Sequence, residues 1–143
     1  MTDILSLTAI DLRKEVAKAQ GYKVKESHVC TFANLSGMNR REAYRYSLQK
    51  DGKEVAFSLV SAENVLPPLD LVHAFPLVHE MNEWGWGVYI ESRPDALQTV
   101  IIEAETDKAI RKARCRYYEV GFNTDPSDAL AKCYLLVRKE MGV

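Results

Sequence analysis

The fold is decided by residues 69–103, LDLVHAFPLVHEMNEWGWGVYIESRPDALQTVIIE, where the apolar pattern changes from helical to strand periodicity. In the first half, apolar side chains recur at helical spacing at Leu71, Phe75, Val78 and Met81. This spacing predicts an amphipathic helix with these residues on its buried side. Asp70 is placed to cap the first turn of this helix. Gly85 is placed to end the helix, because glycine accepts a conformation with positive φ.

Pro76 leaves two starting points open for this helix. If the helix begins near Asp70, Pro76 lies in its interior and removes one backbone hydrogen bond. If the helix begins after Ala74, Pro76 lies in the first turn, where the missing N–H costs little.

In the second half, the period changes to two. Trp86, Val88 and Ile90 alternate with Tyr89 and Glu91, and the run restarts over residues 97–103 after Arg93-Pro94-Asp95. This alternation predicts a β-hairpin. We expect the Phe75 side of the helix to cover a sheet that includes Ile90 and Val100, because each apolar face needs a covering layer.

The N-terminal half begins with an expected helix over residues 8–20, where Thr8 and Asp11 have capping-box spacing and Gly21 follows. Strands are expected over residues 28–33, 43–49 and 54–60. Lys50-Asp51-Gly52-Lys53 predicts a two-residue hairpin turn, since Asp-Gly accepts positive φ.

The C-terminal part has one segment that is open between a wide turn and a short helix, at residues 104–112. A strand is expected over 114–122, and Thr124-Asp125-Pro126 indicates the start of a last helix by a capping side chain followed by proline. The apolar stripe of that helix is Leu130, Cys133, Tyr134, Val137 and Met141.

The resulting order is helix, three strands, helix, three strands, helix. It predicts an α+β sandwich with mostly antiparallel sheet in a single domain spanning residues 1–143. With 19 basic and 20 acidic residues, the chain lacks the basic excess of dedicated nucleic-acid binders. The three cysteines are widely spaced, and neither a membrane span nor a signal peptide is recognisable, so an intracellular, membrane-free protein is expected.

Two stretches resemble the phage ABA sandwich domain family. The first carries Val78, Glu80, Met81, Gly85 and Trp86, and the second carries Thr124, Pro126 and Ala129, with a looser similarity at residues 12–22. The resemblance implies a small accessory protein of a tailed phage or prophage, acting in the cytoplasm of the bacterial host. It brings no catalytic residues with it.

Three groups of residues are candidate ligand-binding sites: Trp84 and Trp86; Asn39, Arg40, Arg41 and Arg45; and Arg114 and Arg116 beside Arg111 and Lys112. The tryptophans offer an aromatic platform, and the arginines offer phosphate or acidic-partner contacts. If residues 114–118 form a strand, Lys112, Arg114 and Arg116 share one face. The alternatives are core and helix-end packing for the tryptophans, a solvated loop for residues 39–45, and a charged edge strand for the last group.

Catalytic and metal-binding patterns are missing from the sequence. There is no nucleophile elbow or phosphate loop, and His28, His73 and His79 are too scattered for ligand spacing. The absence of these patterns favours a non-enzymatic binding protein without cofactor or metal. The resemblance to the phage family, taken with this absence, implies that the chain counteracts a host defence by sequestering a nucleotide signal or by occluding a defence protein. The alternatives are a virion assembly module, possible as a homo-oligomer, and a small nucleotide or phosphodiester hydrolase.

Overall fold

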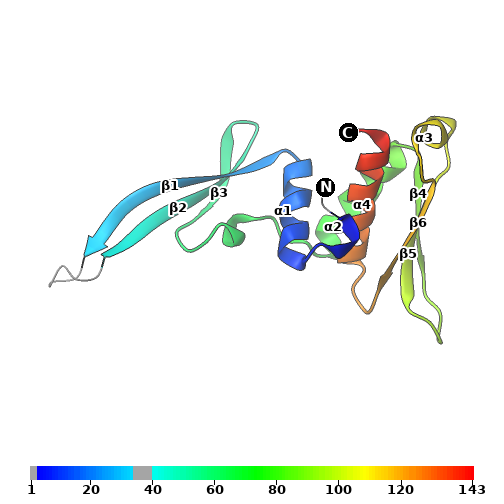
Figure 1. The fold of residues 1–143 in the computed structure, drawn as a ribbon, viewed down its shortest axis with the longest axis horizontal. Helices are drawn as coiled ribbons and strands as arrows, with labels where there is room; N and C mark the ends of the chain where they lie inside the picture. Colours follow the sequence, from blue (N-terminus) through cyan, green and yellow to red (C-terminus); the bar gives the residue numbers. More distant parts are fainter. Residues whose placement is uncertain (1–2, 34–39) are drawn as a thin grey trace. The chain divides into compact units, whose positions relative to one another are not determined.

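The computed structural model describes residues 3–33 and 40–143, with side chains for all of these except 30–33 and 40–42. The elements, in chain order, are η1 (Ile4–Ser6), α1 (Ala9–Ala19), β1 (Tyr22–Ala33), β2 (Arg40–Lys50), β3 (Lys53–Ser58), η2 (Glu63–Val65), α2 (Leu71–Glu83), β4 (Trp86–Glu91), β5 (Gln98–Ala104), α3 (Asp107–Lys112), β6 (Tyr117–Phe122) and α4 (Ser127–Met141) (Figure 1). They form two antiparallel three-stranded sheets with helices, so the α+β class is confirmed.

The chain divides into two compact units, Arg13–Pro67 and the remainder, Met1–Leu12 with Pro68–Val143. The expectation of one domain over residues 1–143 stays a prediction. Each unit contains one of the sheets, β1-β2-β3 in the first and β4-β5-β6 in the second.

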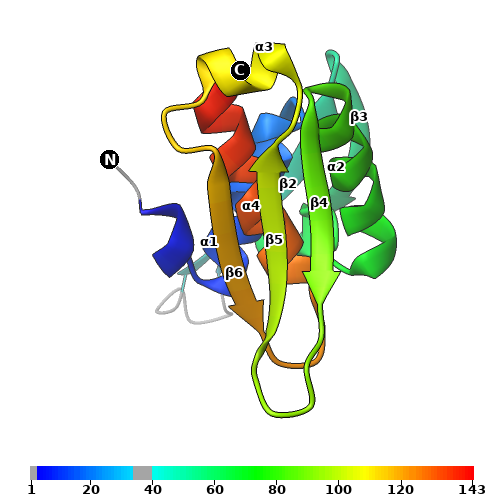
Figure 2. The ribbon, with the colours of Figure 1, turned by 90° about the vertical axis from the view of Figure 1, so that its right-hand side faces the viewer.

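In the second unit, α2 and α4 lie behind the sheet β4-β5-β6 when the sheet faces the viewer (Figure 2). The central strand β5 contributes Val100 and Ile102 to the core, and both are fully buried. The stripe expected for α4 is confirmed, because all five of its residues are buried. This helix ends at Gly142, whose φ of 71° suits glycine.

Helix α2 begins at Leu71, so Pro76 lies in its interior. The Asp70 carboxylate accepts a hydrogen bond of 3.0 Å from the backbone N–H of His73, as the capping prediction requires. Gly85, with φ of 91°, follows the C-cap Trp84. Both predicted ends of this helix are therefore confirmed.

The buried side predicted for α2 is confirmed at Met81 but is wrong at Leu71 and Phe75. The buried side chains are Ala74, Leu77 and Met81, whereas Phe75 is 61% exposed. Ala74, Leu77 and Met81 have a helical spacing too, so periodicity alone does not choose between two apolar sides. Tertiary packing makes that choice.

The hairpin of β4 and β5 forms as predicted, with Val88 opposite Ile102 and Ile90 opposite Val100. Its covered face buries Trp86 and Val100, but Ile90 near the strand end is 55% exposed. The expected packing of Phe75 over Ile90 and Val100 is therefore wrong, because only Val100 belongs to the core.

Residues 104–112 contain the short helix α3, and the Thr106 hydroxyl caps it by accepting the N–H of Ala109 at 3.3 Å. The strand expected from residue 114 begins only at Tyr117. Lys112 ends α3, and Arg114 and Arg116 lie in irregular backbone, so their predicted common strand face is wrong. In that segment the backbone N–H of Arg114 donates to the Glu140 carboxylate instead of to a neighbouring strand.

In the first unit, β1, β2 and β3 form a meander in which Val24 lies opposite Leu48. Asp51 and Gly52 have φ of 54° and 76°, which confirms the predicted hairpin turn. Strand β1 starts at Tyr22, six residues earlier than expected, and its first half, YKVKES, has too few apolar residues to be recognised as a strand. The connector after β3 contributes the buried Val65 and Leu66.

The helix α1 matches its expected range, and the Thr8 hydroxyl donates to the Asp11 carboxylate at 2.8 Å. Farther along the helix, the Arg13 guanidinium donates to the carbonyl of Leu66 at 2.9 Å and to that of Pro67 at 3.3 Å. These bonds fasten the connector after β3 to Arg13.

Candidate functional site

Trp86 was expected to serve as part of an aromatic platform, and that prediction is wrong. Its side chain is 1% exposed and is among the largest fully buried side chains. Its indole Nε1 has no hydrogen-bond partner among the described residues. Trp86 is a core residue of the sheet, which was the alternative reading of the sequence.

Trp84 is half-buried at the end of α2. Its ring stacks on that of Tyr134, with centroids 5.8 Å apart and an interplanar angle of 21°. The Arg138 guanidinium lies 5.9 Å from the centroid of the Trp84 ring. Contacts with α4 therefore engage this ring.

Arg45 takes part in an ion pair across neighbouring strands. Its Nη1 lies 2.5 Å from Oε1 of Glu54, and its guanidinium carbon lies 4.5 Å from the centroid of the Phe57 ring. The hydrogen bond from Arg45 lowers the pKa of Glu54. Arg45 thus holds β2 against β3 and is already paired with an acid.

The structure describes little of the other candidate residues in the Arg45 group, which are Asn39, Arg40 and Arg41. Arg40 and Arg41 open β2, and their side chains lie outside the description, as does the whole of Asn39. Their assignment as ligand-binding residues stays a prediction. Asn39 to Arg45 and the two tryptophans belong to different units.

Arg114 lines a shallow pocket of ≈ 230 Å³ together with Lys112, Lys139 and Glu140. The Glu140 carboxylate accepts the Arg114 backbone N–H at 2.8 Å, and Lys112 Nζ donates to the carbonyl of Met141 at 3.1 Å. Lys112, Arg114 and Lys139 thus lie around the carboxylate of Glu140, and the role of Arg114 and Arg116 in ligand binding stays a prediction. Arg116 is exposed in the same irregular segment.

A surface that the sequence analysis did not single out is the outer face of β4-β5-β6, which we call the open sheet face. It is made by the residues that alternate with the core positions: Gly87, Tyr89, Glu91, Thr99, Ile101, Glu103, Tyr117, Glu119 and Gly121. The helices α2 and α4 lie on the opposite side, and no other described element of Pro68–Val143 lies over it (Figure 2).

The register arranges this face in rows. Tyr89 lies opposite Ile101, and Ile101 lies opposite Glu119, so an aromatic ring, an aliphatic group and a carboxylate stand side by side. Tyr89 and Tyr117 are 50% and 46% exposed, which leaves both rings accessible. The face therefore offers apolar contact area beside negative charge.

Carboxylates gather around both tyrosines. The Tyr89 hydroxyl donates to Glu105, which follows β5, and the Tyr117 hydroxyl donates to Glu119. These hydrogen bonds raise the pKa of each tyrosine, with smaller contributions from the charge of Glu103. A Cβ at Gly87 would collide with the Glu105 carboxylate, so glycine leaves the space that this carboxylate occupies.

The charge of the open sheet face is negative. It holds the carboxylates of Glu91, Glu103 and Glu119, with Glu105 beside them. Arg93 in the β4–β5 loop forms an ion pair with Glu91. The unit that carries this face has nine Lys and Arg against fourteen Asp and Glu, whereas residues 13–67 have ten against six.

The alternation of Tyr89 and Glu91 with Trp86 did show which residues share this face. The sequence contains no local indication that helices cover only one side of the sheet, because both faces contain apolar residues. That is why the face was missed.

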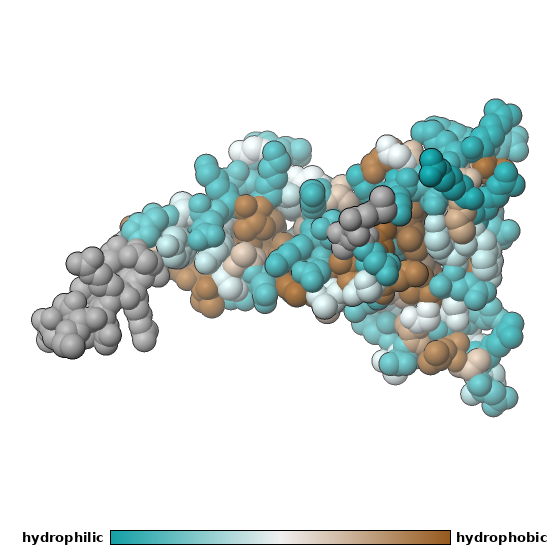
Figure 3. Space-filling model, viewed as in Figure 1, coloured by the Kyte–Doolittle hydropathy of each residue, from teal (hydrophilic) through white to brown (hydrophobic). Residues whose placement is uncertain are grey.

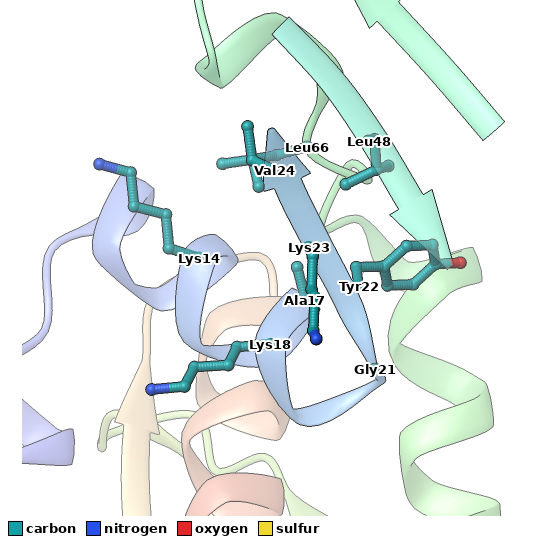
Figure 4. Close-up of a pocket in the computed structure, with 9 residues that line it drawn as sticks. All are labelled: Lys14, Ala17, Lys18, Gly21, Tyr22, Lys23, Val24, Leu48 and Leu66. Carbon is teal, nitrogen blue, oxygen red and sulfur yellow. The ribbon is translucent and has the colours of Figure 1, made fainter. Parts of the chain in front are cut away.

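A pocket of ≈ 500 Å³ lies in the first unit between α1 and the start of the sheet (Figure 4). It is lined by Lys14, Ala17, Lys18, Gly21, Tyr22, Lys23, Val24, Leu48 and Leu66. Its described lining contains three lysines and no Asp or Glu, over an apolar floor that includes Leu48 and Leu66. Figure 3 shows apolar patches among the polar surface of the β1–β3 region.

Two of the three histidines lie beside carboxylates, whereas the ring of His28 meets that of Tyr44 edge to face. His73 Nδ1 lies 2.6 Å from Asp70, and His79 Nε2 lies 3.0 Å from Glu83. Within the described part of the chain, no group of three or more His, Cys, Asp or Glu side chains is arranged to hold a metal ion. Nor does any helix of the described residues have the length and apolarity to cross a bilayer.

Comparisons of the chain with protein-family models, with curated proteins and with solved structures find no match.

Proposed function

We propose that this chain is a non-enzymatic binding protein that occludes another protein, and that the open sheet face is its binding surface. The single observation that carries the proposal is this face, which no described helix of Pro68–Val143 covers and in which two half-exposed tyrosines and Ile101 lie among carboxylates. Tyrosine is enriched in protein interfaces because it offers a large, rigid apolar ring and a polar tip.

The proposed context is a phage or prophage accessory protein in the cytoplasm of a bacterial host, where the occluded partner is a defence protein. The support for this context is the resemblance of residues such as Val78, Glu80 and Trp86 to the phage ABA sandwich domain. Occlusion needs no reaction, since a binder in excess lowers the free concentration of its partner by mass action.

The test is the plating of phage on defended bacterial strains that express the chain. We expect restored plating on at least one strain, and loss of this effect in the double variant Tyr89→Ala/Tyr117→Ala. The matched control is Val55→Ala/Phe57→Ala, which removes side chains of similar exposure from β3 in the other unit. Equal plating with both double variants would contradict the proposal.

A second candidate function is sequestration of an anionic nucleotide signal in the pocket of the first unit. The observation in its favour is the set of Lys14, Lys18 and Lys23 without a carboxylate among the described lining residues. Its volume lies within the roughly 300–1,000 Å³ of ordinary ligand sites. Calorimetry with cyclic dinucleotides and ADP-ribose tests it: we expect heat that disappears in Lys14→Ala/Lys18→Ala/Lys23→Ala. Absence of heat with the unmodified chain would refute this candidate.

A further inference from the structure

We propose that the open sheet face binds a protein surface that presents arginine side chains. The inference rests on the proposed function and names the chemistry of the partner. It is carried by the placement of tyrosine rings beside carboxylates on a sheet face that no described helix of Pro68–Val143 covers.

The first step is charge. Glu103 and Glu119 lie in neighbouring strands of the face, and Glu105 lies over Gly87. Arg93 is paired with Glu91 at the loop end, and no Lys or Arg occupies any of the nine strand positions of the face. A partner surface with positive charge therefore fits this face, because like charges across an interface repel one another while opposite charges guide association.

The second step distinguishes arginine from lysine. The planar guanidinium stacks on aromatic faces and pairs with carboxylates through two parallel hydrogen bonds, whereas the lysine ammonium is a strongly hydrated point charge. The half-exposed rings of Tyr89 and Tyr117 each lie beside a carboxylate, Glu105 and Glu119 respectively. Each pair thus offers a ring for stacking and an acid for pairing within reach of one guanidinium.

The third step is shape. Gly87 and Gly121 carry no side chains on the face, and Ile101 is its central apolar group. The aliphatic stem of an arginine can cover Ile101 while its head group reaches an acid, since long basic side chains bury their stems along apolar surface. Arg45 over the Phe57 ring, with its ion pair to Glu54, shows the same combination inside this chain.

The test uses a deca-arginine peptide and a deca-lysine peptide as probes of the full chain in calorimetry. We expect deca-arginine to bind at least about threefold more tightly than deca-lysine, as one exposed cation–π contact predicts. Binding weakens steeply between about 0.05 and 0.5 M NaCl, because salt screens exposed charges.

Matched variants locate the binding. Glu103→Gln/Glu119→Gln is expected to weaken deca-arginine binding by about tenfold, the sum of two favourable exposed pairs. Glu15→Gln/Glu26→Gln makes the same change of net charge in the other unit and leaves binding within about twofold. Tyr89→Phe/Tyr117→Phe keeps the rings and retains the preference for arginine, whereas Tyr89→Ala/Tyr117→Ala abolishes it.

A readout independent of affinity comes from the amide resonances of glycines. With deca-arginine, the resonances of Gly87 and Gly121 shift, and those of Gly21 and Gly52 in the other unit stay in place. Circular dichroism melts of each variant show that the fold is retained before its binding is compared.

Several outcomes overturn the inference: equal affinity for the two peptides, equal loss in both Glu double variants, or shifts at Gly21 and Gly52 only. Light scattering that shows a dimer broken by Glu103→Gln/Glu119→Gln also overturns it, since the occupant is then a second copy. If deca-arginine fails to bind while Tyr89→Ala/Tyr117→Ala still removes the plating effect, the proposed function stands and the partner class falls. If deca-arginine binds to the open sheet face but the chain has no plating effect, the partner class stands and the proposed function falls.

Discussion

The hydroxyl of Tyr118 in β6 donates a hydrogen bond of 2.5 Å to Oε1 of Glu140, in the last turn of α4. The second oxygen of the same carboxylate accepts the backbone N–H of Arg114 at 2.8 Å. One carboxylate therefore fastens both β6 and the irregular segment before it to the helix behind the sheet. Because β6 carries Tyr117 and Glu119, this contact also positions one edge of the open sheet face.

Replacing Glu140 by Gln should lower the free energy of unfolding by about 1 kcal/mol at neutral pH, the value of an ordinary hydrogen bond, because the site is partly exposed. Burial raises the pKa of Glu140, but the hydrogen bonds from Tyr118, Arg114 and Cys115 outweigh it and lower the pKa below the ordinary 4.5. The stabilisation is therefore complete above pH 4.5 and is lost as the pH falls through the lowered pKa. Urea unfolding at several pH values measures this loss, with Glu83→Gln on the surface of α2 as the control. If the difference in unfolding free energy between the unmodified chain and Glu140→Gln stays the same in acid, the assignment is contradicted.

Gly85 should tolerate alanine less well than Gly142, although both have positive φ, 91° and 71°. A Cβ at Gly85 would collide with the Thr106 hydroxyl that caps α3, whereas nothing lies within 4 Å of a Cβ at Gly142. We expect Gly142→Ala to cost about 1 kcal/mol from backbone strain alone, and Gly85→Ala to cost clearly more. Thermal unfolding of the two variants measures the difference, and equal costs would show that Thr106 moves away freely.

Trp86 should behave as a core residue. Trp86→Ala is expected to lower the free energy of unfolding by about 3–5 kcal/mol, as for other large core truncations. Trp86→Phe should cost much less, about 1 kcal/mol, because it keeps an aromatic ring and removes an indole N–H that has no described partner. Denaturant unfolding followed by the fluorescence of Trp84 measures both, and a mild effect of Trp86→Ala would contradict the core assignment.

Cys133 and Cys115 should differ in reactivity towards a thiol reagent at pH 8, measured in the Cys30→Ala background. Cys115 is exposed, whereas Cys133 is fully buried in α4, where burial raises the pKa of its thiol to about 12. Since the thiolate is the reacting species, Cys115 reacts rapidly and Cys133 reacts only after unfolding. Equal rates for the two thiols in the native chain would mean that α4 opens readily; Cys115→Ala identifies which thiol has reacted.

Sequence-based prediction succeeded where the deciding interactions are local. The Asp70 cap, the Asp51-Gly52 turn and the buried stripe of α4 all depend on residues within a few positions of one another. Capping, positive φ and helical spacing are properties of short segments, so the printed residues suffice to recognise them.

Prediction failed where distant segments compete for the same surface. The strand expected from residue 114 starts only at Tyr117, because Glu140, 26 residues later, takes the backbone N–H of Arg114. Among the candidate site residues, Trp86 proved buried and Arg45 paired with Glu54. Neither outcome can be predicted from the neighbouring residues in the sequence, since each depends on which strand or helix packs beside the residue.

The sequence by itself determined the order and type of the main elements and most of their ends. Only the tertiary structure decided that Ala74 and Leu77, and not Phe75, join Met81 in the core. It also decided that helices cover one side of β4-β5-β6 and leave Tyr89 and Tyr117 on the other. The physical reason is that a periodic pattern shows which side chains share a face, while burial of that face depends on the packing of elements far apart in the chain.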